Sequence, residues 1–148
     1  MTEQQRDLLL RDLSARLPYG VIFRDESAKD DFKLMGIATA PSGYFSVGSM
    51  YRDSSWEDVK PYLRPLSSMT EEECEQMQRD LSPNGTAGYL RDCISIPASH
   101  FGGCIPYEYM ASVVEWLYAR HFDIHNLIWQ GLAIEVTGKY NPYKNDKT

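Results

Sequence analysis

The chain has 148 residues, of which 43% are hydrophobic and 24% are charged, a composition typical of one globular domain and not of a disordered segment. A formal net charge of −6 argues against binding to the backbone of a nucleic acid, for which proteins usually present a basic surface. No stretch approaches the ~20 apolar residues that span a bilayer, and the charged N-terminus is unlike a signal peptide, so we expect a cytoplasmic protein without membrane contact.

The sequence from Thr2 to Leu17 predicts an amphipathic helix. Gln5 has the spacing to complete a capping box with Thr2, and leucines recur every four residues from Leu9 onward, so one apolar stripe should face a core. Pro18 ends the helix, because the residue before a proline is pushed out of the helical region. The charged residues on the other faces are Asp7, Arg11, Asp12 and Arg16.

Three short strands are predicted next, over residues 20–24, 32–39 and 44–47. The polar segment 25–31 and a Pro-Ser-Gly turn separate them. Connections this short indicate a small antiparallel meander.

Two prolines and two capping boxes determine the elements that we predict over residues 55–81. Pro61 and Pro65 exclude a long helix, so we expect a short turn at 55–59 and then an extended segment at the edge of the sheet. Residues 67–81 predict a helix, because two overlapping capping boxes stand at its start. The boxes pair Ser68 with Glu71 and Thr70 with Glu73.

The following stretch is expected to be extended over 86–96 and to form a loop over 97–103. Pro106 suits the first turn of a helix, and apolar residues at helical spacing then continue to about His121.

Asp123 is expected to cap a short second helix that runs through Gln130 and is closed by Gly131. Residues 132–136 predict the last strand, and a frayed polar tail should begin at about residue 141. The elements together predict a single α+β domain over all 148 residues: a small antiparallel sheet, which could curl into a partial barrel, packed by the N-terminal helix and two or three C-terminal helices. We interpret Ser68, Glu71, His121, Asp123 and Gly131 as structural joints.

Three phrases of the sequence carry a family resemblance. They are ARLPYGV at 15–21, KPYLRPLSSM at 60–69, and HFD at 121–123 with LI at 127–128 and GLAI at 131–134. These phrases resemble a family of small proteins encoded by phages and prophages of gut Bacteroides. The resemblance implies a small intracellular protein from a phage or integrated element, a class in which many members act on host machinery or host defence. The family carries no assigned catalytic residue to transfer, and Ile124 and His125 stand where it has an aromatic residue followed by arginine.

Cysteine and histidine residues give weak signals for chemistry. The three cysteines, an odd number, fit free thiols in a reducing compartment. The spacings of Cys93, His100, Cys104, His121 and His125 do not match common zinc modules, so we expect no metal and no cofactor. A hydrolase that depends on Cys104 or on His121 is kept as an alternative, although no nucleophile signature surrounds them and we favour a protein that is not an enzyme.

Aromatic and arginine side chains give the strongest signal for binding. Rings can stack on a base while guanidinium groups hold a phosphate, and the same residue types are enriched at protein interfaces. Ten tyrosines in a chain of this size cannot all be functional, so part of the set should belong to the core. The set is Tyr19, Arg24, Tyr51, Arg52, Trp56, Tyr62 and Arg64.

The family resemblance, and not any site in the sequence, implies a phage or mobile-element accessory protein that binds a host protein without catalysis, as an inhibitor of host defence or regulation. One alternative is a sponge that sequesters a small nucleotide signal, with its pocket formed in the monomer or at the interface of a homo-oligomer. The hydrolase is the other.

Overall fold

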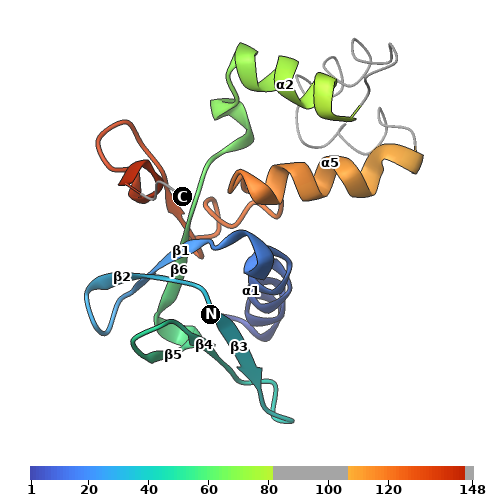
Figure 1. Cartoon of the computed structure of the whole chain (residues 1–148). Helices are drawn as coiled ribbons and strands as arrows, with labels where there is room; N and C mark the ends of the chain where they lie inside the picture. Colours follow the sequence, from blue (N-terminus) through green and yellow to red (C-terminus); the bar gives the residue numbers. More distant parts are fainter. Residues whose placement is uncertain (82–106, 146–148) are drawn as a thin grey trace.

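The computed structural model describes residues 1–81 and 107–145 of the chain (Figure 1). Within these residues it confirms the predicted α+β class, with an N-terminal helix, two small sheets and two further helices. The helices are α1 (Glu3–Arg16), α2 (Glu71–Leu81) and α5 (Tyr107–Ala119). The strands are β1 (Ile22–Asp25), β2 (Asp30–Lys33), β3 (Gly36–Thr39), β4 (Phe45–Gly48), β5 (Asp53–Ser55), β6 (Val59–Leu63) and β7 (Ile134–Glu135). Short 3-10 turns are η1 (Leu17–Tyr19), η2 (Trp56–Asp58), η3 (Leu66–Ser68) and η5 (Pro142–Asn145). The extended segment, loop and helix start predicted over 86–106 lie outside the described residues.

The chain changes sheets where a single strand was predicted over 32–39. β2 belongs to a four-stranded sheet of order β2-β1-β6-β7, whereas β3 belongs to a three-stranded sheet of order β3-β4-β5. Leu34 N still donates to Val21 O at 2.9 Å, but Met35 N donates to Gly48 O at 2.8 Å, so the backbone changes partner between these two residues. Neither sheet closes on itself within the described residues, and the anticipated curl into a partial barrel is not seen there.

β6 lies inside the first sheet and not at its edge, which corrects the prediction. It pairs antiparallel with β1 and parallel with β7. Glu26 N donates to Asp58 O, so the backbone N–H and C=O groups of the even-numbered residues in β6 point toward β1. The backbone nitrogen of Pro61 therefore points to the opposite side, toward β7. Pairing with β7 begins only at Tyr62. The proline therefore breaks no ladder bond, and the edge position belongs to β7, the strand predicted over 132–136.

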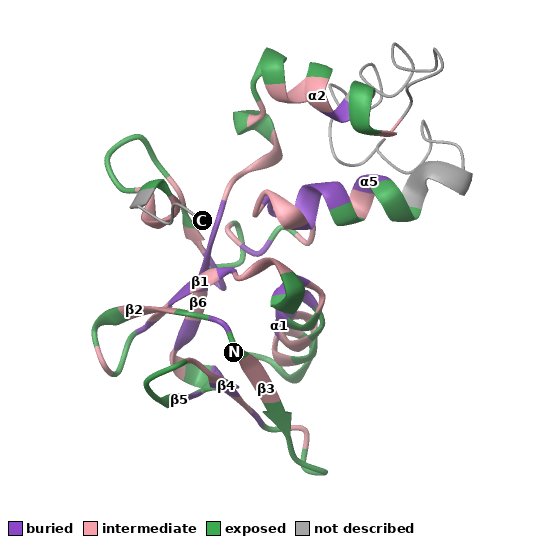
Figure 2. Cartoon of the chain, viewed as in Figure 1, coloured by how far each residue is buried: buried purple, intermediate pink, exposed green. Residues whose placement is uncertain are grey.

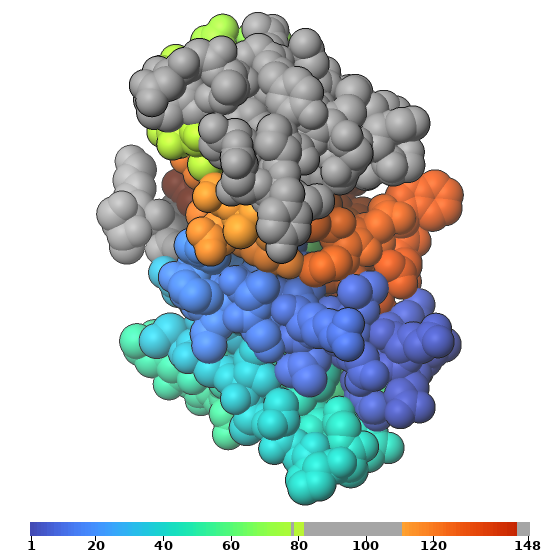
Figure 3. Space-filling view, turned by 90° about the vertical axis from the view of Figure 1, so that its right-hand side faces the viewer, coloured from blue at the N-terminus to red at the C-terminus, as the bar shows by residue number. Residues whose placement is uncertain are grey.

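α1 packs its leucine stripe against the sheets to form the main core. Leu9 and Leu13 are fully buried together with Phe23 of β1, and Figure 2 colours the buried parts of these elements purple. Leu17, the third leucine of the stripe, is 37% exposed because it begins η1 after the helix ends. In Figure 3, α1 (blue) lies between the second sheet and the layer that contains α5 (orange), so one helix joins both halves of the molecule.

Two of the three predicted capping boxes are present. Gln5 N donates to Thr2 Oγ1 at 3.1 Å while Thr2 N donates to the Gln5 side chain at 3.0 Å. Glu73 N donates to Thr70 Oγ1 at 3.1 Å, and Thr70 N donates to Glu73 Oε1 at the same distance. Ser68 does not cap α2, because it lies in η3 and its hydroxyl donates to a backbone carbonyl three residues earlier at 2.7 Å.

Asp12 and Arg16 form a buried ion pair, although the sequence predicted them on polar faces of the helix. Both side chains are 0% exposed, and Arg16 Nε donates to Asp12 Oδ2 at 2.6 Å. Arg16 Nη2 donates to Asp12 Oδ1 at 3.1 Å and to Phe122 O at 2.6 Å. His125 Nδ1 lies 2.9 Å from Asp12 Oδ1, and the guanidinium lies 4.8 Å from the centre of the Tyr118 ring. The pair thus links α1 to α5 and to the loop that follows it.

The environment of Asp12 favours its charged form. Burial alone raises the pKa of this carboxyl, because a buried charge loses its hydration. The hydrogen bond from His125 and the positive charge of Arg16 act in the opposite direction and outweigh burial, so the pKa of Asp12 lies below its ordinary value.

A second, smaller core lies between α2 and α5, which run side by side in Figure 1. Met77 of α2 is fully buried against Leu117 of α5 and against Phe122, which follows α5. Trp116 Nε1 donates to Asp80 Oδ2 at 2.9 Å, which ties the two helices together at the rim. No helix in the described ranges is both long and apolar enough to cross a bilayer.

The polar tail expected from about residue 141 is anchored at its start. Tyr143 Oη accepts a hydrogen bond from Ile22 N at 3.0 Å and donates one to Tyr62 O at 2.8 Å, so it joins β1 to β6. The His121 ring stacks on the Tyr143 ring with centroids 3.8 Å apart. The chain is therefore held to the first sheet as far as η5.

Candidate binding surface

The loop after α5 begins with a backbone turn that ends the helix. His121 has a positive φ of 65°, and its N–H donates to Tyr118 O at 3.0 Å. Phe122 N donates to Leu117 O at 3.0 Å, which completes the bonding pattern that usually has glycine at the left-handed position. Histidine is less suited to this conformation, and its stacking on Tyr143 helps to hold it there.

The same loop is fastened to the end of β6. Arg64 N donates to His121 O at 2.8 Å, and Asp123 N donates to Arg64 O at 2.7 Å. The Arg64 guanidinium lies 4.2 Å from the centre of the Phe122 ring and donates to both carboxylate oxygens of Glu73 at 2.6 Å. The hydrogen bond from Arg64 lowers the pKa of Glu73 despite partial burial, so this pair stays charged.

Asp123 folds the next residues into a single turn and not into the predicted short helix through Gln130. Its Oδ1 accepts from Leu127 N at 2.9 Å and its Oδ2 from Ile128 N at 3.0 Å. An N-cap side chain bonds two or three residues ahead, whereas Asp123 reaches four and five residues ahead, so a loop must intervene. Gly131, at φ 74°, ends this turn and not the helix that it was expected to close, and the next N–H donates to Leu127 O at 2.9 Å.

This turn presents Trp129 to solvent. The Trp129 side chain is 86% exposed, more than any other large hydrophobic residue in the described parts of the chain, whereas Leu127 on the inner side is fully buried. Trp129 lines a groove of about 660 Å3 between the turn, η3 and β7. Leu66, Ile124 and Ile128 form its apolar wall, and we call these three residues with Trp129 the Trp129 groove.

The Trp129 groove also carries negative charge. Asp123 and Glu135 line it, and none of the described lining residues is Lys or Arg. The Asp123 carboxylate is satisfied by the two backbone N–H groups of the turn. Glu135 is exposed on the edge strand β7, and within the described residues it has no ion pair, so its charge is available to a partner.

Of the residues predicted to bind a ligand or partner, Arg24 and Tyr62 lie together. Tyr62 is only 3% exposed, and its hydroxyl donates to Asp31 Oδ1 at 2.8 Å. Arg24 Nη1 lies 3.6 Å from the same oxygen. Burial and the neighbouring Asp31 carboxylate raise the pKa of Tyr62 well above its usual value, so this hydroxyl keeps its proton.

Three other predicted residues lie on or beside the second sheet. Trp56 is buried, with its ring 6.0 Å from that of Tyr44. Arg52 Nε lies 3.3 Å from Oδ2 of the buried Asp25, and Tyr51 is 82% exposed in the loop between β4 and β5. These residues are separate from Arg24 and Tyr62 and face different partners.

Arg64 pairs with Glu73, as described above, and Tyr19 is half-buried in η1. The structure therefore does not bring the predicted aromatic and arginine residues into one surface, and their role in binding stays a prediction. The proposed joints lie where chain elements end: Ser68 in η3, Glu71 at the start of α2, His121 after α5, and Asp123 and Gly131 at the two ends of the turn.

Cys93, His100 and Cys104 lie outside the described residues, so the thiol and imidazole arrangement also stays a prediction.

The Trp129 groove was not predicted, because Ile124, Ile128 and Trp129 were expected to lie in a helix. A helix can bury adjacent residues such as Ile128 and Trp129 on one apolar face, so the sequence pattern does not mark Trp129 as exposed. The contribution of Leu66 could not have been predicted either, because it comes from a distant segment.

Comparison of the chain with family models, with curated proteins and with solved structures finds no match. The function is therefore inferred from the geometry and from the phrases described above.

Proposed function

We propose that this protein binds another protein through the Trp129 groove and does so without catalysis. The observation that carries the proposal is the 86% exposure of Trp129 on a turn fixed by hydrogen bonds at both ends. An exposed tryptophan gains much free energy when a partner covers it, and tryptophan is enriched among the residues that dominate interface energetics. A backbone that is already ordered loses little entropy on binding, which favours affinity.

The groove indicates the chemistry of the partner. Leu66, Ile124 and Ile128 provide an apolar wall for an aliphatic or aromatic side chain. The free charge of Glu135 and the net charge of −6 favour a partner segment that also carries lysine or arginine. The proposed partner surface is therefore basic and apolar.

The proposed biological setting follows from the resemblance of the three sequence phrases to small phage proteins. In this setting the chain is an accessory protein of a Bacteroides phage or prophage, and its partner is a host protein of defence or regulation that it inhibits. Only the family resemblance supports the host and the inhibitory role, whereas the Trp129 groove supports protein binding itself.

Native mass spectrometry of the tagged protein purified gently from Bacteroides cells tests the proposal. We expect a stoichiometric host protein with the wild type and its loss with Trp129→Ala. Tyr51→Ala is the matched control, because Tyr51 is an aromatic residue of similar exposure, 82%, outside the groove. With the purified partner, Trp129→Ala should weaken binding by about 2 kcal/mol or more, roughly thirtyfold, and Glu135→Gln should weaken it less.

Two results would contradict the proposal. Equal retention of the partner by Trp129→Ala and Tyr51→Ala, with unchanged urea midpoints, would show that the groove is not the binding surface. A dimer of the pure wild-type chain that Trp129→Ala converts to monomer would show that a second copy, and not a host protein, covers the groove.

A further inference from the structure

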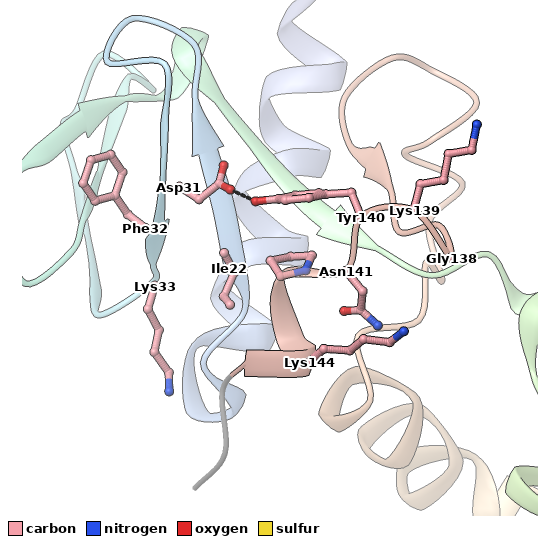
Figure 4. Close-up of a pocket in the computed structure, with 10 residues that line it drawn as sticks. Ile22, Asp31, Phe32, Lys33, Gly138, Lys139, Tyr140, Asn141 and Lys144 are labelled. Atoms are coloured by element: carbon pink, nitrogen blue, oxygen red, sulfur yellow. Dashed lines mark hydrogen bonds between the residues drawn. The ribbon is translucent and has the colours of Figure 1, made fainter.

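A second hollow, separate from the Trp129 groove, lies between the first sheet and the C-terminal segment (Figure 4). Its volume is about 620 Å3, within the range of roughly 300–1,000 Å3 that small-molecule sites usually have. Ile22 and Phe32 lie on the strand side, and residues 138–142 with Lys144 form the opposite wall.

Asp31 of β2 fixes the aromatic wall of this hollow. The Tyr140 hydroxyl donates to Asp31 Oδ2, the contact drawn as a dashed line in Figure 4, and the Tyr62 hydroxyl donates to Oδ1 at 2.8 Å. Arg24 lies 3.6 Å from Oδ1, so the negative charge of Asp31 is offset by a cation and two hydroxyl donors. The Tyr140 ring rests against the Tyr62 ring with centroids 5.4 Å apart and stays 49% exposed, which leaves part of it open to a ligand.

Positive charge gathers around the same hollow. Lys33, Lys139 and Lys144 line it, three of the six lysines in a chain whose net charge is −6. Asp31 is the only acid among the described lining residues, and its charge is already offset. In Figure 4 the ammonium group of Lys144 and the amide of Asn141 lie on the same side of the hollow, so donors and cations are available together.

We propose that this hollow binds a small anionic ligand with a planar ring, of the class of a free nucleoside monophosphate. The base stacks on Tyr140, and the phosphate pairs with Lys144 and accepts a hydrogen bond from the Asn141 amide, while Lys139, whose ammonium group points away from Lys144 in Figure 4, adds positive charge at the rim. A polymeric nucleic acid is a poorer fit, because its many phosphates would meet the acidic remainder of the surface. This site shares no residue with the Trp129 groove, so either proposal can fail without the other.

Isothermal titration of the full chain with AMP and, separately, with inorganic phosphate tests this site at low ionic strength. Lys139→Gln/Lys144→Gln should weaken AMP binding about tenfold or more, because the phosphate contact of Lys144 and the nearby positive charge of Lys139 are lost. Lys29→Gln/Lys60→Gln is the matched control: it removes the same charge from residues that do not line the hollow, and should change affinity less than about twofold.

Two tyrosine variants separate the ring from the anion contact. Tyr140→Leu should weaken AMP binding but leave phosphate binding unchanged, because it removes only the stacking surface. Tyr140→Phe keeps the ring and loses the bond to Asp31, so it should retain AMP binding and controls for any loss of stability. Absence of AMP binding by the wild type up to about 1 mM, or equal weakening by the two lysine pairs, would overturn the proposal. Equal AMP binding by Tyr140→Leu and the wild type would refute recognition of the base.

Discussion

Replacing Asp12 by Asn should destabilise the protein far more than a substitution at a charged helix position usually does. Asp12 and Arg16 are both 0% exposed, and the Asp12 carboxylate receives three hydrogen bonds, two from Arg16 and one from His125. Asn keeps the shape of the side chain but removes the negative charge. The Arg16 guanidinium is then left buried without an anionic partner, with Phe122 O, the Tyr118 ring and one amide oxygen as its contacts among these residues.

The expected loss follows from this burial. Breaking a buried ion pair by removing one partner costs about 3–5 kcal/mol, because the remaining charge is uncompensated. Asn can still accept one hydrogen bond, so we expect the lower end, about 3 kcal/mol. For a domain of this size that corresponds to a fall of roughly 6–12 °C in the unfolding temperature.

Urea unfolding at neutral pH measures the effect, with a shift of the midpoint at constant slope as the sign of lost stability. Asp7→Asn is the matched control on the same helix, since the Asp7 side chain is 53% exposed and 3.6 Å from Arg6, and should change stability by less than about 0.5 kcal/mol. The double variant Asp12→Leu/Arg16→Met leaves no buried charge. Its loss in free energy of unfolding should therefore be about 2 kcal/mol smaller than the sum of the losses in Asp12→Leu and Arg16→Met alone. If Asp12→Asn and Asp7→Asn unfold at the same urea concentration, the reasoning is wrong.

Three further predictions concern pH, a capping residue and a turn. Because the pKa of Asp12 is lower in the folded state than in the unfolded chain, its contribution to the free energy of unfolding should be present above about pH 4 and be lost as pH falls through the folded pKa. A urea series from pH 7 to acid should therefore fall less steeply in Asp12→Asn than in the wild type; parallel curves would contradict this. Thr70→Ala should lower the free energy of unfolding, measured with urea, by about 1 kcal/mol, and Ser68→Ala should lower it less, because Thr70 and not Ser68 caps α2. A larger loss for Ser68→Ala would indicate that Ser68 is the cap. Gly131→Ala should cost about 1 kcal/mol through its positive φ, whereas Gly138→Ala, also in open space but without a positive φ, should be near neutral by thermal unfolding; equal effects would exclude backbone strain as the cause.

The parts of the fold that depend on neighbours in sequence could be predicted. The leucine spacing and the Thr2 capping box identify α1, because both signals lie within one helix. Gly131 was expected to close a short helix; no helix forms there, but Gly131 does end the segment at a positive φ. The class α+β follows from such local signals, since few architectures accommodate these elements.

The parts that depend on distant residues could not be predicted. A charged residue on a helix normally faces water, and the burial of Asp12 depends on His125, 113 positions away. The division of the strand predicted over 32–39 depends on Met35 finding Gly48 in a second sheet. Trp129 is exposed because the Asp123 carboxylate accepts hydrogen bonds from Leu127 N and Ile128 N and so forms a turn. Helical periodicity in the sequence does not reveal these bonds.

The Trp129 groove lies where the two cores of the molecule meet, and this position bears on its function. Ile124 and Leu66 pack against the core between α2 and α5, whereas Ile128 packs against the core between α1 and the sheets. The backbone of Arg64 joins the two parts by its hydrogen bonds to the loop after α5. The groove wall is thus supported from both sides, so a partner finds it already formed and little ordering opposes binding. A partner that fills the groove contacts both cores at once, and because it binds only when both are folded and docked, its binding stabilises the whole arrangement by mass action.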